Sequence, residues 1–285
     1  MKIKNKCQGS TDKSMNRILC SIGAIIGRPN GRDITLLNKC LEQLECDGYE
    51  FLMYETWYEK EEEILGFLAD FPAPLPVFHC EKGVGDLISR NLEGDFEQAL
   101  ELFEINCRMA KKIGSEKLVL HLWSGLDSDK DMPHNVEAYG ILREISDKYG
   151  LALTVENVVC NRQDPMTHLI TLAQTYPDIP FTFDTKMAEF HNQLDLLYRE
   201  ENARLLPNIV HMHINDYKGG FKEWKKLRTL HIGEGQIDFD RLFAFLKRIG
   251  YKGDFTVEAT SFNESGEIDF EALNRSFRKI REYLE

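Results

Sequence analysis

Three carboxylates each close a short apolar stretch of this sequence. Glu156 ends Leu-Thr-Val-Glu, Asp184 ends Phe-Thr-Phe-Asp, and Glu258 ends Phe-Thr-Val-Glu. Side chains in such stretches are buried or half-buried, and an unpaired charge there is costly. Carboxylates brought close together also repel one another, which raises their pKa values or demands a cation. Few Lys or Arg residues fall in the neighbouring apolar stretches, so a bound metal explains the set better than an internal ion-pair network.

Two imidazoles occupy a similar stretch, Val-His-Met-His-Ile. His211 and His213 share one face of an extended chain, because side chains alternate along a strand. His213 lies nearer the carboxyl end and is the better ligand, whereas His211 supports the ligands or lies deeper. One imidazole with three carboxylates is a hard, oxygen-rich set that suits one divalent ion: Mn, Mg, Co or Zn.

Other polar residues lie near the ends of the same apolar stretches. We expect some of them to contact a substrate, although a buried histidine satisfied by hydrogen bonds is an equally good interpretation of His79 and of His121. The predicted substrate-binding set is His79, His121, Trp123, Asn157, Lys186, Asp216 and Lys218.

Short apolar runs alternate with longer amphipathic segments along the chain. The runs are rich in β-branched and aromatic residues and predict eight strands, at 18–26, 49–54, 75–80, 117–123, 151–158, 180–184, 209–214 and 255–259. The longer segments predict helices at 34–46, 59–70, 96–113, 136–149, 239–249 and 270–284.

Eight strands, each followed by a helix, indicate a parallel sheet closed into a (β/α)8 TIM barrel. We predict one barrel domain over residues 16–285, preceded by a flexible lead-in at 1–15. An open doubly wound sheet is the alternative, but the segment from Gly23 to Gly27 lacks the full glycine-rich phosphate-binding pattern. In a barrel the active site lies at the carboxyl ends of the strands, which is where the metal-ligand candidates stand.

Composition excludes several classes of partner. The 285 residues carry a formal net charge of -12, which disfavours binding to a phosphate backbone. No apolar run approaches the roughly 18 residues that span a membrane, and the first 16 residues have no apolar core of a secretion signal. Seven cysteines without a CxxC pair indicate reduced thiols. We therefore expect a cytoplasmic protein that binds neither nucleic acid nor membrane.

The chain resembles the xylose isomerase-like TIM barrels, a superfamily of sugar and sugar-phosphate isomerases and epimerases that also holds endonuclease IV. The motifs that carry the resemblance are Thr-Val-Glu-Asn at 154–157, Phe-Asp-Thr at 183–185, Val-His-Met-His-Ile-Asn-Asp-Tyr at 210–217, Ile-Gly-Glu-Gly-Gln-Ile-Asp at 232–238 and Thr-Val-Glu at 256–258. The resemblance implies that Glu156, Asp184, His213 and Glu258 are the metal ligands. It also implies that Glu156 and Glu258 are the catalytic acid/base pair.

Four positions depart from the family pattern. Met187 stands where the nuclease and the ketose epimerases have a histidine, and Leu227 and Thr229 replace an Asp and a His of the nuclease. By this comparison the second and third zinc ions of the nuclease lack ligands. Asn215 replaces the usual lysine of the His-X-His motif.

The expected reaction is isomerisation or epimerisation of a sugar or sugar phosphate. It begins with removal of a proton next to a carbonyl, and the metal would stabilise the resulting enediolate. An inosose-type dehydratase would share that first step. An endonuclease-like phosphodiesterase, a metal-independent glycosidase using Glu156 and Glu258, and a sugar-binding barrel without turnover remain alternatives.

A basic segment follows the seventh predicted strand. Between residues 216 and 236 lie five cationic side chains with two interleaved aromatic ones: Lys218, Lys222, Lys225, Lys226, Arg228, Phe221 and Trp224. Barrel loops at this position often bind phosphate, so we predict a lid that holds an anionic substrate group, with a solvated loop as the alternative. Barrels of this type often pair, so a homo-oligomer is also considered, although no residue marks an interface.

Overall fold

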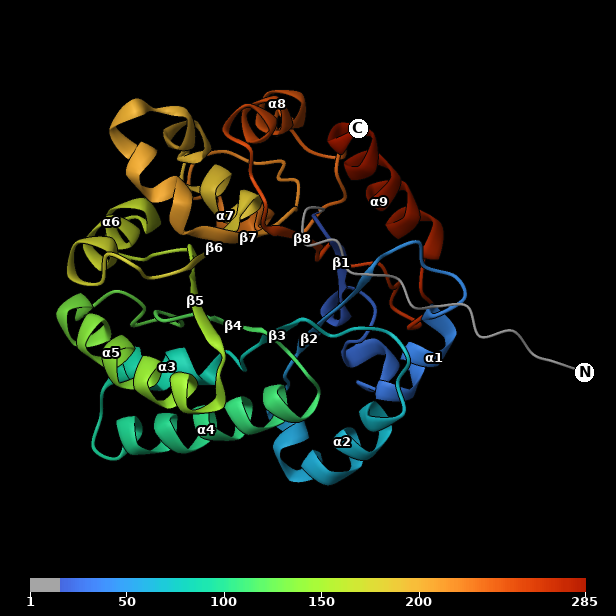
Figure 1. Cartoon of the computed structure of the whole chain (residues 1–285), viewed down its shortest axis with the longest axis horizontal. Coiled ribbons are helices and arrows are strands. Elements are labelled where there is room, and N and C mark those ends of the chain that lie inside the picture. Colours follow the sequence, from blue (N-terminus) through green and yellow to red (C-terminus); the bar gives the residue numbers. More distant parts are fainter. Residues whose placement is uncertain (1–15) are drawn as a thin grey trace, which may run out of the picture.

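The computed structural model describes residues 16–285, which form a closed barrel of eight parallel strands. Each strand is hydrogen-bonded to the next, and the last closes on the first. Figure 1 looks along the barrel and shows the strands as an inner ring. The predicted (β/α)8 TIM barrel is confirmed. The strands are β1 (Ile18–Ser21), β2 (Gly48–Leu52), β3 (Val77–His79), β4 (Lys117–Leu120), β5 (Ala152–Glu156), β6 (Phe181–Asp184), β7 (Ile209–His213) and β8 (Asp254–Val257).

Helices surround this ring and connect its strands (Figure 1). Their bounds are α1 (Leu37–Cys40), α2 (Glu61–Ala69), α3 (Gly83–Arg90), α4 (Asp95–Lys112), α5 (Met132–Tyr149), α6 (Pro165–Thr175), α7 (Thr185–Phe190), α8 (Phe239–Ile249) and α9 (Phe270–Leu284). Short 3-10 helices lie in the connections at η1 (Ile22–Ala24), η2 (Arg28–Asn30), η3 (Ile34–Leu36), η4 (Glu55–Lys60), η5 (Leu194–Tyr198), η6 (Glu200–Asn208) and η7 (Trp224–Lys226).

Several elements are shorter than the sequence predicts, and β1 and α1 differ most. Strand β1 ends at Ser21 because the Ser21 side chain accepts the backbone N–H of Gly23 and starts η1. Helix α1 ends at Cys40, although the apolar spacing predicts a helix to residue 46. Asn274 of α9 accepts the N–H of Glu45 and donates to the carbonyl of Gln43, which holds this backbone outside a helix.

Strand register places one set of side chains inside the barrel. Glu156 pairs with Thr182, and Thr182 pairs with His211 on the next strand. Paired residues face the same side, so the residues two positions before each ligand carboxylate also point inward. These are Thr154, Thr182 and Thr256, all fully buried, with Thr154 Oγ1 lying 2.7 Å from Thr182 Oγ1. The carboxylates therefore lie above a polar layer inside the barrel.

One glycine sets the distance between a helix and the site. A Cβ atom added at Gly85 of α3 would lie 1.8 Å from the carbonyl oxygen of His121. Only a residue without a side chain lets α3 approach the end of β4 this closely. Helix α3 thereby packs directly behind His121, a residue of the predicted substrate-binding set.

Within residues 16–285 no helix is long and apolar enough to cross a membrane. The six cysteines in this range form no disulfide with one another, and Cys20, Cys40, Cys80, Cys107 and Cys160 are buried. The predicted lead-in at residues 1–15 lies outside the described part of the chain.

Candidate active site

The four predicted ligands come together at the carboxyl ends of the strands. Glu156, Asp184, His213 and Glu258 each offer one ligand atom, and these atoms all lie within 4.8 Å of one another. The first three end β5, β6 and β7, and Glu258 directly follows β8. Glu156, Asp184 and His213 are buried, whereas the side chain of Glu258 keeps 17% of its surface exposed. The cluster is therefore open to solvent mainly on the side of Glu258.

Asp184 is fixed by the backbone around it. Its Oδ1 accepts the N–H of Met187 at 2.9 Å, which caps α7. The amide of Asn157 pairs with both backbone groups of Asp184, at 2.6 and 3.0 Å. Burial raises the pKa of Asp184 to about 6, with repulsion from Glu156 and Glu258 adding to it against the attraction of Lys186. This carboxylate is short of positive charge, as expected for a cation ligand.

Asn215 links two of the ligand carboxylates. Its Nδ2 donates to Asp184 Oδ2 and to Glu258 Oε2, both at 3.0 Å, and its Oδ1 accepts the N–H of Glu258 at 3.2 Å. The lysine usual at this position would bring a positive charge beside the ligands. The asparagine orients them without neutralising them.

One ring nitrogen of His213 contacts two of these carboxylates. Its Nδ1 is 3.2 Å from Glu156 Oε1 and 3.4 Å from Glu258 Oε2. Burial lowers the pKa of His213, but the negative charges of Glu258, Glu50 and Glu156 outweigh it and hold this pKa well above its usual value. The side of the ring that carries Nδ1 therefore faces the ligand carboxylates.

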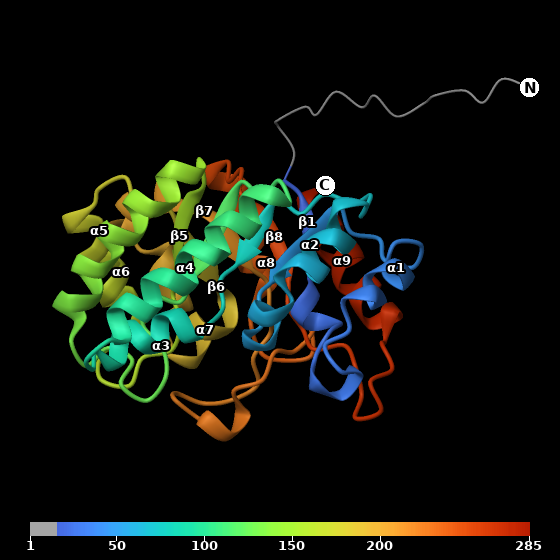
Figure 2. The same ribbon diagram turned by 90° about the horizontal axis from the view of Figure 1, so that it is seen from below.

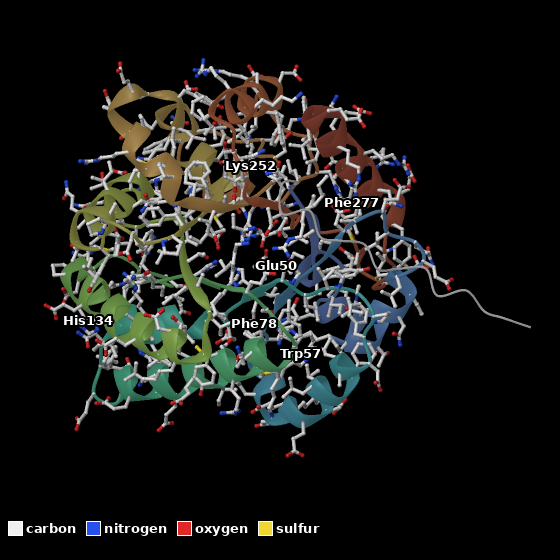
Figure 3. All side chains as sticks on the ribbon, viewed as in Figure 1. Glu50, Trp57, Phe78, His134, Lys252 and Phe277 are labelled. Carbon is white, nitrogen blue, oxygen red and sulfur yellow. The ribbon has the colours of Figure 1, made fainter. Side chains whose placement is uncertain are left out.

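Glu50, which the sequence analysis missed, supports this histidine from below. It lies in the middle of β2, is fully buried, and contacts His213 Nε2 through Oε1 at 3.1 Å and His211 Nε2 through Oε2 at 2.9 Å. Figure 3 shows Glu50 near the centre of the ring of strands. The sequence signal that could have found it is a carboxylate within an apolar strand, between Tyr49 and Phe51, whereas Glu156, Asp184 and Glu258 were identified because each ends such a stretch.

A second group of possible ligands adjoins the first. His79, His121 and Glu156 bring one ligand atom each to within 4.8 Å of one another. His79 Nδ1 donates to the carbonyl of Cys80 at 2.8 Å, and its Nε2 lies 3.3 Å from Glu156 Oε2. His121 Nε2 lies 2.8 Å from the same oxygen, and burial lowers the pKa of His121 to about 4 despite Glu156.

Neither histidine forms a hydrogen bond with Glu156 Oε2, which is buried without a hydrogen-bond partner among residues 16–285. Two imidazole nitrogens and one carboxylate oxygen without a hydrogen-bond partner that converge in this way fit a cation better than a hydrogen-bond network. This group does not include positions 187, 227 and 229, so the expectation that further zinc ions of the nuclease lack ligands stays a prediction.

The side chains of three residues in the predicted substrate-binding set form hydrogen bonds with the backbone of this protein. The indole N–H of buried Trp123 donates to the carbonyl of Val158 at 3.0 Å. Asp216 accepts backbone N–H groups from four residues of its own loop, namely Tyr217, Gly233, Gly235 and Ile237. Asn157 holds Asp184, as described above. These contacts assign the three side chains to building the site, and a direct role in substrate binding stays a prediction.

The basic segment projects at the same end of the barrel. Figure 2 shows it in orange beyond the strands. Trp224 packs edge-on against Phe190 with ring centroids 5.0 Å apart, and Lys222 Nζ donates to the carbonyl of Gln163 at 3.2 Å. Lys218 is exposed, whereas Lys186 is buried with Nζ 3.7 Å from Asp184 Oδ2. Lys186 thus belongs to the ligand cluster, and the predicted lid remains untested.

Comparison with known proteins finds one family. The family model described as the xylose isomerase-like TIM barrel matches residues 40–283. The inosose dehydratase of Erwinia tasmaniensis is 26% identical over 174 residues, which cover 55% of this chain and 56% of that protein. An uncharacterised protein of Methanocaldococcus jannaschii is 27% identical over 188 residues, covering 62% of this chain and 59% of that protein. The chain thus spans less than two thirds of the length of either relative.

Solved structures share the fold over nearly the whole chain. A D-tagatose 3-epimerase-like protein superimposes with a TM-score of 0.68 at 21% identity, covering 94% of this chain and 97% of that one. The IolI protein, solved with a bound zinc atom, gives a TM-score of 0.73 at 16% identity, covering 94% and 98%. At these identities the similarity shows the fold alone.

Proposed function

This chain belongs to the xylose isomerase-like TIM barrel family, and from that premise we propose that it is a divalent-metal-dependent isomerase or epimerase of a sugar or sugar phosphate. One observation carries the proposal: Glu156, Asp184, His213 and Glu258 converge within 4.8 Å, with Glu156 Oε2 lacking any hydrogen-bond partner among the described residues. The epimerase-like and zinc-containing solved structures and the inosose dehydratase relative support it.

The donor set decides which ions fit. Three carboxylates and one imidazole are hard ligands that accept Mn, Mg, Co or Zn. A divalent ion held there would polarise a substrate carbonyl and offset the negative charge that develops as the neighbouring proton leaves.

Two of the same residues would move the proton. The nearest oxygens of Glu156 and Glu258 lie 3.2 and 3.4 Å from the same atom, His213 Nδ1, so both carboxylates border the place where a substrate would bind. One carboxylate can take the proton from the carbon next to the carbonyl, and the other can return it, to the opposite face in an epimerase. Lys186, buried beside Asp184, would add a positive charge near the developing oxyanion.

Dehydration is the closest variant of this reaction. An inosose dehydratase would begin with the same proton removal and then expel a hydroxyl group. The relative from Erwinia tasmaniensis carries that name, so keto-polyols belong in any substrate survey.

A second candidate function is two-metal hydrolysis of a phosphate ester. The group of His79, His121 and Glu156 favours it, because Glu156 is common to both ligand groups and could bridge two ions. The net charge of -12 weighs against nucleic acid as its substrate.

Solvent deuterium exchange tests the proposed function. The protein, loaded with Mn²⁺, Co²⁺, Mg²⁺ or Zn²⁺, is incubated in D₂O with ketoses, inososes and their phosphates, and the carbon-bound protons are followed by NMR. We expect deuterium next to the carbonyl of at least one compound, loss of exchange with a chelator, and recovery on adding metal. Phosphorylated and free forms compared side by side show whether the basic segment binds an anion.

The matched variants are Glu156→Gln and Glu258→Gln, with Asp254→Asn as a buried strand carboxylate outside the cluster. The first two should slow exchange by about 10²–10⁴-fold, the usual contribution of acid–base catalysis, and the third should not. No exchange with any compound under any metal loading, or phosphate release from the esters instead, would reject the proposal.

A further inference from the structure

We propose that Glu50 is a positioning residue for the metal centre, holding the His213 ring so that Nδ1 faces the ligand carboxylates. This inference rests on the metal-binding part of the proposed function. Nothing in the ligand set itself requires a fourth buried carboxylate, so Glu50 calls for its own explanation.

Glu50 reaches the cluster from the opposite side of the barrel. Strand register runs from β7 through Thr256 of β8 and Leu19 of β1, and Ser21 of β1 then pairs with Glu50 on β2, so Glu50 and His213 share the inner face. Within that face the Oε1 of Glu50 contacts His213 Nε2 at 3.1 Å. The contact joins the ring nitrogen that points away from the other carboxylates.

His211 holds Glu50 in turn. Its Nε2 lies 2.9 Å from Glu50 Oε2, so each carboxylate oxygen faces one imidazole. Thr256 Oγ1 lies 3.2 Å from the same nitrogen of His211. The Glu50 carboxylate cannot rotate without losing its contact with His211 or with His213, and its orientation is therefore fixed.

The partners of Glu50 distinguish positioning from simple charge pairing. A buried carboxylate is costly, and a Lys or Arg is its usual counter-charge. Among the described residues no Lys or Arg lies within 4.0 Å of Glu50, whose ion-pair partners are both histidines on β7. A carboxylate beyond a ligand imidazole orients the ring and selects the tautomer that leaves the other nitrogen free for metal.

The consequence concerns the ring of His213. When Nε2–H donates to Glu50, the Nδ1 lone pair is directed toward Glu156 and Glu258, where the ion would lie. Without Glu50 the ring can turn about its Cβ–Cγ bond and present either nitrogen. Loss of such a partner usually weakens metal binding by about 10–100-fold.

Metal titration of three full-length proteins tests this inference. Wild type, Glu50→Gln and the control Asp254→Asn are titrated with Co²⁺ while the visible d–d absorption is recorded. We expect Glu50→Gln to raise the Kd by about 10–100-fold and to change the absorption bands. Asp254→Asn should lose stability yet keep the wild-type Kd and spectrum. A Glu50→Gln protein with unchanged Kd and spectrum overturns the inference while leaving the proposed function intact.

A measurement on the wild type guards against a variant that fails to fold. In Zn²⁺-loaded protein labelled with ¹⁵N-histidine, long-range ¹H–¹⁵N correlations report the tautomer of His213. The inference expects a proton on Nε2 and metal on Nδ1, and the reverse arrangement contradicts it. If wild type binds no divalent ion at all, the proposed function fails first, and that outcome is visible without any variant.

Discussion

Asn215 shows how one uncharged side chain arranges two ligands. Its single amide group donates to Asp184, which ends β6, and to Glu258, which follows β8, and its carbonyl oxygen accepts the backbone N–H of Glu258. A neutral amide adds no positive charge beside the two carboxylates, so it sets their geometry without competing with a cation that would bind them. An unsatisfied carboxylate oxygen in the same place would cost about 1–3 kcal/mol.

Replacing Asn215 by leucine should therefore weaken metal binding by about 10-fold or more, because the two carboxylates lose their common donor. Asn208→Leu is the matched control. Asn208 precedes β7 and likewise donates to two backbone oxygens, those of Pro177 and Ile179, but lies far from the ligands along the strand. Competition with a chelator measures both affinities, and equal Kd values for the two variants would refute the role of Asn215.

The convergence of the four candidate ligands could be predicted from sequence, because strand alternation and an acidic residue after an apolar run carry that information. Glu50 was missed because it lies in the middle of its strand, which ends in apolar and aromatic residues rather than in a carboxylate. The backbone partners of Trp123 and Asp216 could not be predicted, because they depend on how loops distant in sequence pack together.

At the scale of the elements, a partly buried ion-pair network joins the amino ends of several strands, at the end of the barrel opposite the candidate site. Asp254 at the start of β8 accepts hydrogen bonds from Arg17, just before β1, at 2.9 Å and from Lys117 at the start of β4 at 2.7 Å. Burial opposes the charged form of Asp254, but these partners outweigh it and lower its pKa to about 2. Three strand starts are thus tied together away from the active site.

The variant Asp254→Asn should lower the free energy of unfolding at pH 7 by about 2 kcal/mol, since each unit of pKa shift corresponds to about 1.4 kcal/mol. The folded pKa lies below the ordinary value of 3.8, so this stabilisation is present above about pH 4 and is lost as pH falls toward 2. Urea unfolding at pH 7 and pH 3 measures it. A difference between the proteins that stays constant with pH would contradict this origin.

The sequence predicts some helices of this fold better than others. Long amphipathic helices such as α4, α5 and α9 follow from apolar spacing alone. Helices α3 and α7 were not predicted, because eight and six residues give too little periodicity. Helix α6 carries a start signal that was overlooked: Asp164 caps Thr167, and Pro165 occupies the first turn.

At the scale of the whole molecule, charge is unevenly distributed in a chain whose formal net charge is -12. Four acidic residues, Glu50, Glu156, Asp184 and Glu258, lie inside the barrel, where they create a local demand for positive charge. The basic segment after β7 stands at the same end (Figure 2) and would attract an anionic substrate toward that mouth. An acidic barrel with one basic rim is consistent with a small anionic ligand.

The central claim is that Glu156, Asp184, His213 and Glu258 hold one divalent ion in common. Anomalous diffraction from crystals grown with Mn²⁺, collected on both sides of the manganese absorption edge, tests it directly. We expect an anomalous peak at about 2.0–2.4 Å from a ligand atom of each of the four residues, in the range of metal–ligand bonds. A peak bound elsewhere, or no peak at saturating Mn²⁺, would contradict the account.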